Sequence, residues 1–174
     1  MLLKGDLMLD LSKESLDNMF VGYHGSPKRF DKFQHCQYYS NYSNSALGIF
    51  VAQDIVGAID YSYTSDPNTQ GYVYIVAFKK EDILEVDEDL FFCFNEKPSE
   101  IDPMGNYVDL CGAATREEYL AQGYRGFKIA DLENCGQAFA IFNPEDIIIL
   151  EVLTTKQAIE KNMLLSSKVP SAMR

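Results

Sequence analysis

Two residues have side chains that could take part in chemistry without help from a cofactor. His24 ends a run of β type (residues 20–24) and precedes a Gly-Ser-Pro sequence, so its imidazole is expected where a strand meets a turn. Taken alone, such a histidine is either an ordinary strand-end residue or a hydrogen-bonding group of a site. Tyr61 ends the segment at residues 48–61, where its ring either fills the core or forms a stacking wall.

The segment that must position Tyr61 changes its hydrophobic period midway. Residues 49–51 are an apolar run typical of a strand, and Asp54 stands where a first-turn acid favours the positive end of a helix. The apolar and small residues that follow recur at helical spacing, as the buried stripe of a short helix would: Ile55, Ala58, Ile59 and Ser62. We therefore expect a strand followed by a helix that carries Tyr61 at the edge of its buried stripe.

The remainder of the chain predicts mostly short strands. A Thr-x-x-Glu pattern at residues 115–118 predicts a helix that starts there and is stopped by Gly123, and a second helix is expected at residues 156–164. Few, segregated helices favour an α+β fold with mainly antiparallel strands around a cleft. The strands are expected at residues 72–78, 83–87, 124–130, 137–142 and 147–152.

The chain length and the lack of a linker-like stretch predict one domain over residues 1–174. Within it we expect an N-terminal extension with a short helix or lid (residues 1–19), a surface loop at residues 34–46, an insertion on one edge of the sheet (residues 88–112) and a C-terminal tail (residues 154–174). Because no apolar run approaches the roughly 20 residues that span a bilayer, we expect no membrane partner and a cytoplasmic protein.

The chain is strongly acidic, with a formal net charge of −11. This charge disfavours a nucleic-acid partner held by its phosphates, because such binding needs a surface rich in lysine and arginine. A protein partner with a basic surface, or a small ligand in a locally basic cleft, fits this charge better. The four cysteines are Cys36, Cys93, Cys111 and Cys135; they form no CxxC pair and have no nearby histidine pair, so we expect no metal site.

Four motifs in order resemble the ADP-ribosyltransferase superfamily, in its compact bacterial or phage-borne branch of the diphtheria-toxin and poly-ADP-ribose-polymerase type. Tyr23-His24-Gly25-Ser26 resembles the first-strand YHG[ST] motif. Residues 48–52, Gly-Ile-Phe-Val-Ala, followed by Tyr61, resemble the second motif, a strand that leads into a helix with the key tyrosine. Residues 123–127 and 139–147 are similar to the family's last two strands and their hairpin, so the resemblance covers most of the chain.

The resemblance implies a split barrel or sandwich of two small sheets around a cleft for NAD+, the co-substrate. His24 would hydrogen-bond a ribose hydroxyl of the adenosine half as a neutral imidazole with a fixed tautomer. Gly25 would grip the carboxamide of nicotinamide with its backbone and would be glycine because the ligand approaches closely. Tyr61 would stack on the nicotinamide ring, with Phe50 packing nearby and the Ser26 hydroxyl in support.

The third motif departs from the family pattern. The family usually has a glutamate just before the strand that ends in Phe142, and this chain has Ala138 there, preceded by Gln137. Gln137 is the first candidate for the missing group, with Glu133 second and Asp131 third. Glutamine can hydrogen-bond a ribose hydroxyl but brings no full charge to an oxocarbenium-like transition state, and one lost electrostatic contact costs about 100- to 1000-fold in rate.

Three functions remain open on this basis. The first is a mono-ADP-ribosyltransferase that releases nicotinamide and modifies a macromolecule, with a protein as the expected target, as a phage or bacterial effector or toxin would. The second is a catalytically weak or inactive module that binds NAD+ or ADP-ribose. The third is an acidic protein-interaction domain with a vestigial cleft.

Overall fold

The computed structural model describes eight ranges of the chain: residues 18–36, 45–63, 69–87, 100–101, 103–104, 107–108, 110–132 and 136–167. Several sequence-based predictions lie outside them, namely the N-terminal extension up to residue 17, most of the loop at 34–46, Glu133, Cys93 and Cys135.

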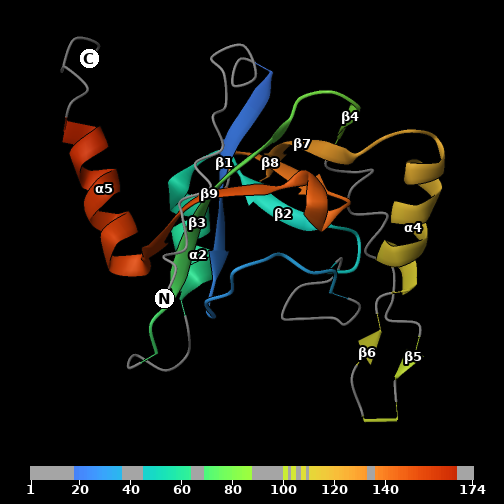
Figure 1. Cartoon of the computed structure of the whole chain (residues 1–174), viewed down its shortest axis with the longest axis horizontal. Coiled ribbons are helices and arrows are strands. Elements are labelled where there is room, and N and C mark those ends of the chain that lie inside the picture. Colours follow the sequence, from blue (N-terminus) through green and yellow to red (C-terminus); the bar gives the residue numbers. More distant parts are fainter. Residues whose placement is uncertain are drawn as a thin grey trace, which may run out of the picture.

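Seven strands form one mixed sheet in the order β4-β7-β8-β2-β1-β3-β9 (Figure 1). All neighbouring strands are antiparallel except β4 and β7, which are parallel. A mainly antiparallel sheet with few helices agrees with the predicted α+β class. The strands are β1 (Met19–Ser26), β2 (Ile49–Ala52), β3 (Tyr72–Lys79), β4 (Ile83–Val86), β7 (Gly126–Leu132), β8 (Gly136–Ile141) and β9 (Ile148–Thr154).

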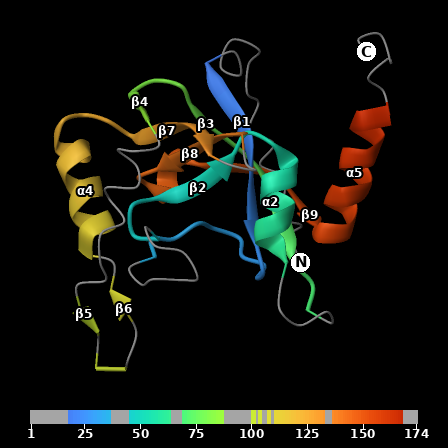
Figure 2. The ribbon, with the colours of Figure 1, turned by 180° about the vertical axis from the view of Figure 1, so that it is seen from behind.

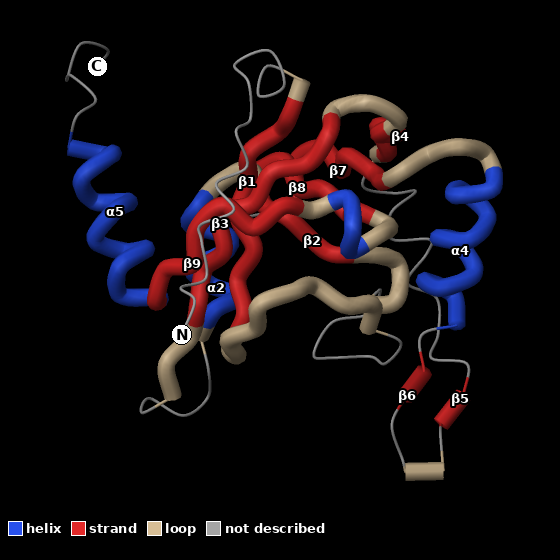
Figure 3. Tube along the Cα trace, in the orientation of Figure 1, coloured by secondary structure: helices blue, strands red, loops and turns tan. Residues whose placement is uncertain are grey.

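The pairing between β1 and β2 is the shortest between neighbouring strands of the sheet. β1 pairs with β3 along its whole length, whereas β1 and β2 share one residue pair, Tyr23 with Ala52. The sheet therefore consists of two blocks, β4-β7-β8-β2 and β1-β3-β9, which Figure 3 shows in red. We call the place where the blocks meet the β1/β2 junction.

The helices follow from the same local patterns. α2 (Ile55–Ser62) begins after Asp54, whose carboxylate accepts a hydrogen bond from the backbone N–H of Val56 at 2.7 Å. The predicted stripe at positions 55, 58, 59 and 62 is buried. α5 (Thr155–Ser167) lies beyond α2, and α4 (Leu110–Ala121) lies at the opposite end of the sheet (Figure 2).

The predicted start of α4 is wrong. The helix begins at Leu110, so Thr115 stands inside it instead of capping it. Ala113 and Ala114, which precede the Thr-x-x-Glu pattern, have the highest helix propensity and carry the helix through it. The predicted stop is confirmed, because Gly123 adopts a left-handed φ of 95° just after the helix.

The insertion contributes a separate pair of strands. β5 (Glu100–Ile101) and β6 (Tyr107–Val108) pair with each other, and Figures 1 and 2 show them past the end of α4, away from the main sheet. These two described strands form a small sheet of their own. Between β8 and β9, the predicted turn is a short 3-10 helix (Pro144–Asp146).

Hydrophobic clusters define two faces of the sheet. On the aromatic face, Phe139 of β8 contacts the rings of Phe20 and Phe78, with centroids 4.8 and 5.1 Å apart. Since β8 is not a neighbour of β1 or β3 in the sheet, these contacts show that the sheet curls around this face. On the other, helix face, residues of α2 and α5 pack against Val73 and Leu153, while side chains of α4 pack against Phe127.

Candidate functional site

The first and second motifs meet at the β1/β2 junction. His24 and Gly25 directly follow Tyr23, the only residue of β1 that the structure pairs with β2. Phe50 lies two residues before Ala52, the partner of Tyr23. The described structure therefore brings the two strands together, but the side chain of His24 lies on the aromatic face, whereas the side chain of Phe50 and helix α2 lie on the helix face.

His24 spans the junction with its side chain. Its Nδ1 lies 2.7 Å from the carbonyl oxygen of Phe50, and because a carbonyl only accepts, Nδ1 carries the proton. Burial lowers the pKa of His24 below its ordinary value of 6.5, and the hydrogen bond to Phe50 opposes this with a smaller effect. The imidazole is therefore neutral near pH 7, and Nε2 is its acceptor.

Three aromatic rings hold the imidazole in place. His24 meets Phe33 edge-on at 5.0 Å, with Phe30 and Tyr74 at 6.1 and 6.2 Å. The Tyr74 hydroxyl accepts a hydrogen bond from the backbone N–H of Phe30 at 2.7 Å, and the two rings stack at 4.2 Å. Tyr74 was missed, although strand alternation in residues 72–78 could have placed it on this face.

The lowered pKa of His24 makes stability depend on pH. Below about pH 6.5 the unfolded chain protonates this imidazole while the native state does not, so the native state binds fewer protons. Stability is therefore expected to fall as the pH drops from about 6.5 to the lower pKa of the folded protein, by at most about 1.4 kcal/mol per pH unit.

Urea unfolding of wild type and His24→Asn across this pH range tests that expectation. Asparagine does not titrate and keeps an amide N–H for the Phe50 carbonyl. Because all other titrating groups are common to both proteins, the difference between their unfolding free energies isolates His24. Parallel curves for the two proteins would contradict a neutral, buried imidazole.

Gly25 lies beneath the last turn of α2. A Cβ added to Gly25 would overlap the carbonyl oxygen of Ala58 and lie 2.9 Å from the backbone nitrogen of Ser62. The resemblance implies that this residue is glycine because a ligand approaches it closely. In the structure the backbone of α2 itself makes the approach that requires glycine.

Tyr61 stands in the same turn of α2, next to Ser62. Its side chain is 43% exposed, so it does not fill the core, whereas Ser62 is fully buried and its hydroxyl donates to the Ile59 carbonyl. A partly exposed ring on the helix that packs against Gly25 can stack on a flat ligand. Phe50 is partly buried and packs on the helix face with Leu47 and its neighbours.

Ser26 has a local structural role. Its side chain is buried, and its hydroxyl oxygen accepts a hydrogen bond from the backbone N–H of Lys28 at 3.2 Å. This bond closes the turn that follows β1.

The third-motif residues separate onto two faces. Ala138 pairs with Ala52 in β2 and is 6% exposed; Ala52 shares the helix face with its partner Tyr23. Alternation along β8 puts Gln137 on the opposite, aromatic face, the face of Phe139. The backbone carbonyl of Gln137 accepts a hydrogen bond from the backbone N–H of Gln53 at 2.9 Å. Thus Gln137 shares a face with His24, and Ala138 shares one with Phe50 and α2.

The other two acidic candidates are placed less fully. The backbone of Asp131 belongs to β7, at an irregularity where the pairing shifts between Ile129–Ala138 and Leu132–Gly136. Glu133 lies outside the described ranges. Among the described residues, no group of three His, Cys, Asp or Glu side chains could hold a metal ion.

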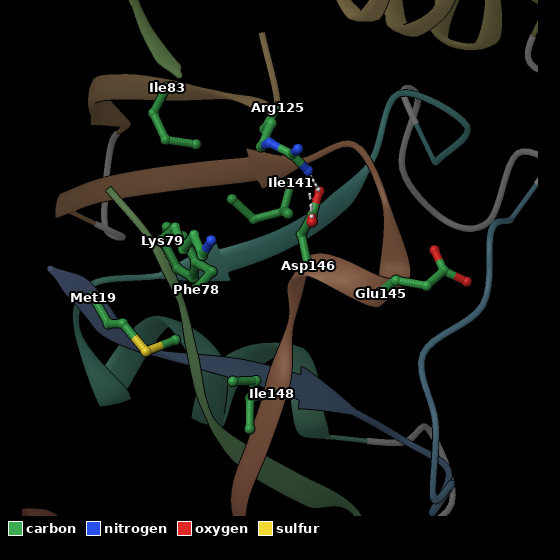
Figure 4. Close-up of a pocket in the computed structure, with 9 residues that line it drawn as sticks. All are labelled: Met19, Phe78, Lys79, Ile83, Arg125, Ile141, Glu145, Asp146 and Ile148. Carbon is green, nitrogen blue, oxygen red and sulfur yellow. Dashed lines mark hydrogen bonds and ion pairs between the residues drawn. The ribbon is translucent and has the colours of Figure 1, made fainter. Parts of the chain in front are cut away.

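A cavity of about 140 Å³ lies at the other end of β1 (Figure 4). Its lining is mixed: Arg125 is ion-paired with Asp146 at 2.9 Å, Lys79 and Glu145 are also charged, and the other side chains are apolar. Because His24 stands at the far end of β1, this cavity is separate from the candidate site. Its lining residues are Met19, Phe78, Lys79, Ile83, Arg125, Ile141, Glu145, Asp146 and Ile148.

No protein-family model matches the chain, and no curated protein matches it. Within the part of the chain that the structure describes, no helix has the length and apolar character to cross a membrane.

Proposed function

We propose that the β1/β2 junction binds NAD+ and that the protein transfers ADP-ribose from NAD+ to a macromolecule. The observation that carries this proposal is the imidazole of His24, which is neutral and held in one tautomer by the Phe50 carbonyl. A ribose hydroxyl needs such a fixed acceptor, and Nε2 supplies it. The proposal also accounts for an exposed tyrosine on a helix that lies against the backbone of Gly25.

The chemistry would proceed at the nicotinamide-bearing ribose. The bond between C1′ and the nicotinamide nitrogen breaks, and its electron pair leaves with neutral nicotinamide. The oxocarbenium-like ribose is then attacked by a nucleophile of the target, which gives up its proton. Stacking by Tyr61 would hold the nicotinamide ring, and His24 would orient the adenosine half, so both residues act by positioning.

A second candidate function has its own support. The third-motif position on the helix face is Ala138, which offers no charge to an oxocarbenium-like ribose. A protein with this residue can bind NAD+ or ADP-ribose with little or no turnover. Under either function, the net charge of −11 favours a target or partner protein with a basic surface. An effector would act on such a target.

Thermal melting with and without NAD+, with nicotinamide release assayed in the same samples, tests the proposal. We expect NAD+ to raise the melting temperature, since a ligand at 100 times its Kd stabilises the native state by about 2.7 kcal/mol. His24→Ala should abolish that shift. His35→Ala, which removes the other histidine of the chain, is the matched control and should retain the shift.

The possible outcomes separate the candidate functions. A shift with nicotinamide release supports transfer, and a shift without release supports a binding module. No shift at millimolar NAD+ would contradict both and leave the acidic surface as the feature to explain.

A further inference from the structure

The loop that follows His24 is basic in an acidic protein. Residues 27–36 contain Lys28, Arg29 and Lys32 against one acid, Asp31, so their net charge is +2 in a chain of −11. The side chains of Lys28 and Arg29 are exposed. A dianionic ligand that approaches the β1/β2 junction therefore meets positive charge on this side.

Lys28 and Arg29 are held close to His24. The backbone N–H of Lys28 bonds the Ser26 hydroxyl at 3.2 Å, which closes the turn directly after β1. The Tyr74 hydroxyl lies 3.4 and 3.2 Å from the carbonyl oxygens of Lys28 and Phe30 and bonds the N–H of Phe30. Burial raises the pKa of Tyr74, so its hydroxyl remains protonated and able to donate. The backbone that carries both cations is thus fixed relative to the imidazole.

Both cations lack an acidic partner within the described ranges. Several other cations there are engaged: Lys32 lies 3.9 Å from Glu145, and Lys128 and Lys161 lie 2.9 and 2.8 Å from Glu85 and Glu151. Neither Lys28 nor Arg29 forms an ion pair with any described residue, so both side chains are available to an anion.

We infer that Lys28 and Arg29 bind the diphosphate of a dinucleotide whose ribose is held by His24. This inference rests on the proposed function and names the residues that would hold the charged part of the substrate. Arginine can pair with two phosphate oxygens through its planar fork, and lysine adds a compact charge. The two cations also offset the repulsion that a protein of net charge −11 exerts on a dianion.

The test compares ligands with and without the diphosphate by calorimetry: ADP-ribose, adenosine and inorganic diphosphate. The variant is Lys28→Ala/Arg29→Ala. The control is Lys79→Ala/Lys80→Ala, which removes the same charge from an adjacent pair at the end of β3 that pairs with Met19, far from His24. We expect the first variant to bind ADP-ribose about 10- to 100-fold more weakly than wild type and to bind adenosine unchanged.

Salt provides a second readout. Between about 50 and about 200 mM salt, wild type and the control should lose affinity for ADP-ribose, and Lys28→Ala/Arg29→Ala should lose less.

Each other outcome overturns the inference in its own way. Equal affinity of the two double variants for ADP-ribose would overturn it and leave the proposed function in place. An equal loss of adenosine binding would show that the cations support the loop and not the diphosphate. Tighter binding of inorganic diphosphate than of ADP-ribose would show that the two cations bind a free anion and not a dinucleotide. If wild type binds neither ADP-ribose nor NAD+, both the inference and the proposed function fail.

Discussion

Replacing Ala138 with glutamate is expected to raise the rate of nicotinamide release from NAD+ about 100- to 1000-fold, the usual effect of one preorganised electrostatic contact in a transition state. Ala138 stands on the helix face opposite Ala52, the residue that pairs β2 with β1 at the junction. A carboxylate at this position would stabilise the positive charge that develops on the ribose as nicotinamide leaves. Single-turnover release of nicotinamide measures the effect directly.

Gln137→Glu is the matched control for this prediction. It adds the same carboxylate one residue earlier, and strand alternation sends it to the aromatic face. We expect little gain in rate. Ala138→Gln adds the same bulk without the charge and separates electrostatics from packing, and the melting temperature of each variant reports the cost of adding a group at a site that is 6% exposed. A gain for Gln137→Glu alone would show that Gln137 is the third-motif residue.

Gly25→Ala is expected to destabilise the protein by about 3 kcal/mol or more, because the new Cβ overlaps the carbonyl oxygen of Ala58. The obstacle is backbone, so it cannot be relieved by a change of rotamer; the whole of α2 must move from β1. A loss of this size is a large part of the 5 to 15 kcal/mol that typically stabilises a domain. Urea unfolding measures it.

Gly123→Ala provides the comparison for the glycine substitution. No atom of the described residues lies within 4 Å of a Cβ at that position, but its φ of 95° disfavours alanine, so we expect a loss of about 1 to 2 kcal/mol. The loss of stability in Gly25→Ala beyond that in Gly123→Ala then measures the contact between Gly25 and α2. Wild-type stability for Gly25→Ala would mean that α2 does not lie against β1 in the way described. Any Gly25→Ala protein that still folds should also bind NAD+ poorly, because Tyr61 moves with α2.

Local patterns in the sequence predicted most of the elements. β-branched and aromatic residues found β3, and the helical recurrence at positions 55, 58, 59 and 62 found the buried stripe of α2. These signals depend on residues close together in the chain, and they succeed where burial alone decides the conformation. The start of α4 was wrong because a capping pattern also occurs inside helices, where Ala113 and Ala114 let the helix continue.

The candidate site depended more on contacts between distant segments. The resemblance placed His24 at a strand end, but its tautomer is set by Phe50, 26 residues away. Tyr74 anchors a loop 44 residues before it, and no local pattern signals that bond. The faces of Gln137 and Ala138 depend on where β8 begins and on its register with β2, which a single sequence does not define.

The way β2 is paired also constrains the order in which the protein folds. β1, α2 and β3 follow one another closely in sequence, so they can assemble while the rest of the chain is still being synthesised. β2 cannot complete its pairing then, because its main partner is β8: Ile49 pairs with Ile141, and Val51 with Phe139. Such distant pairs carry a large loop-closure entropy and form slowly. Until β8 emerges from the ribosome, β2 is an apolar strand held by only one residue pair with β1, and the nascent chain at that stage is exposed to aggregation and to chaperones.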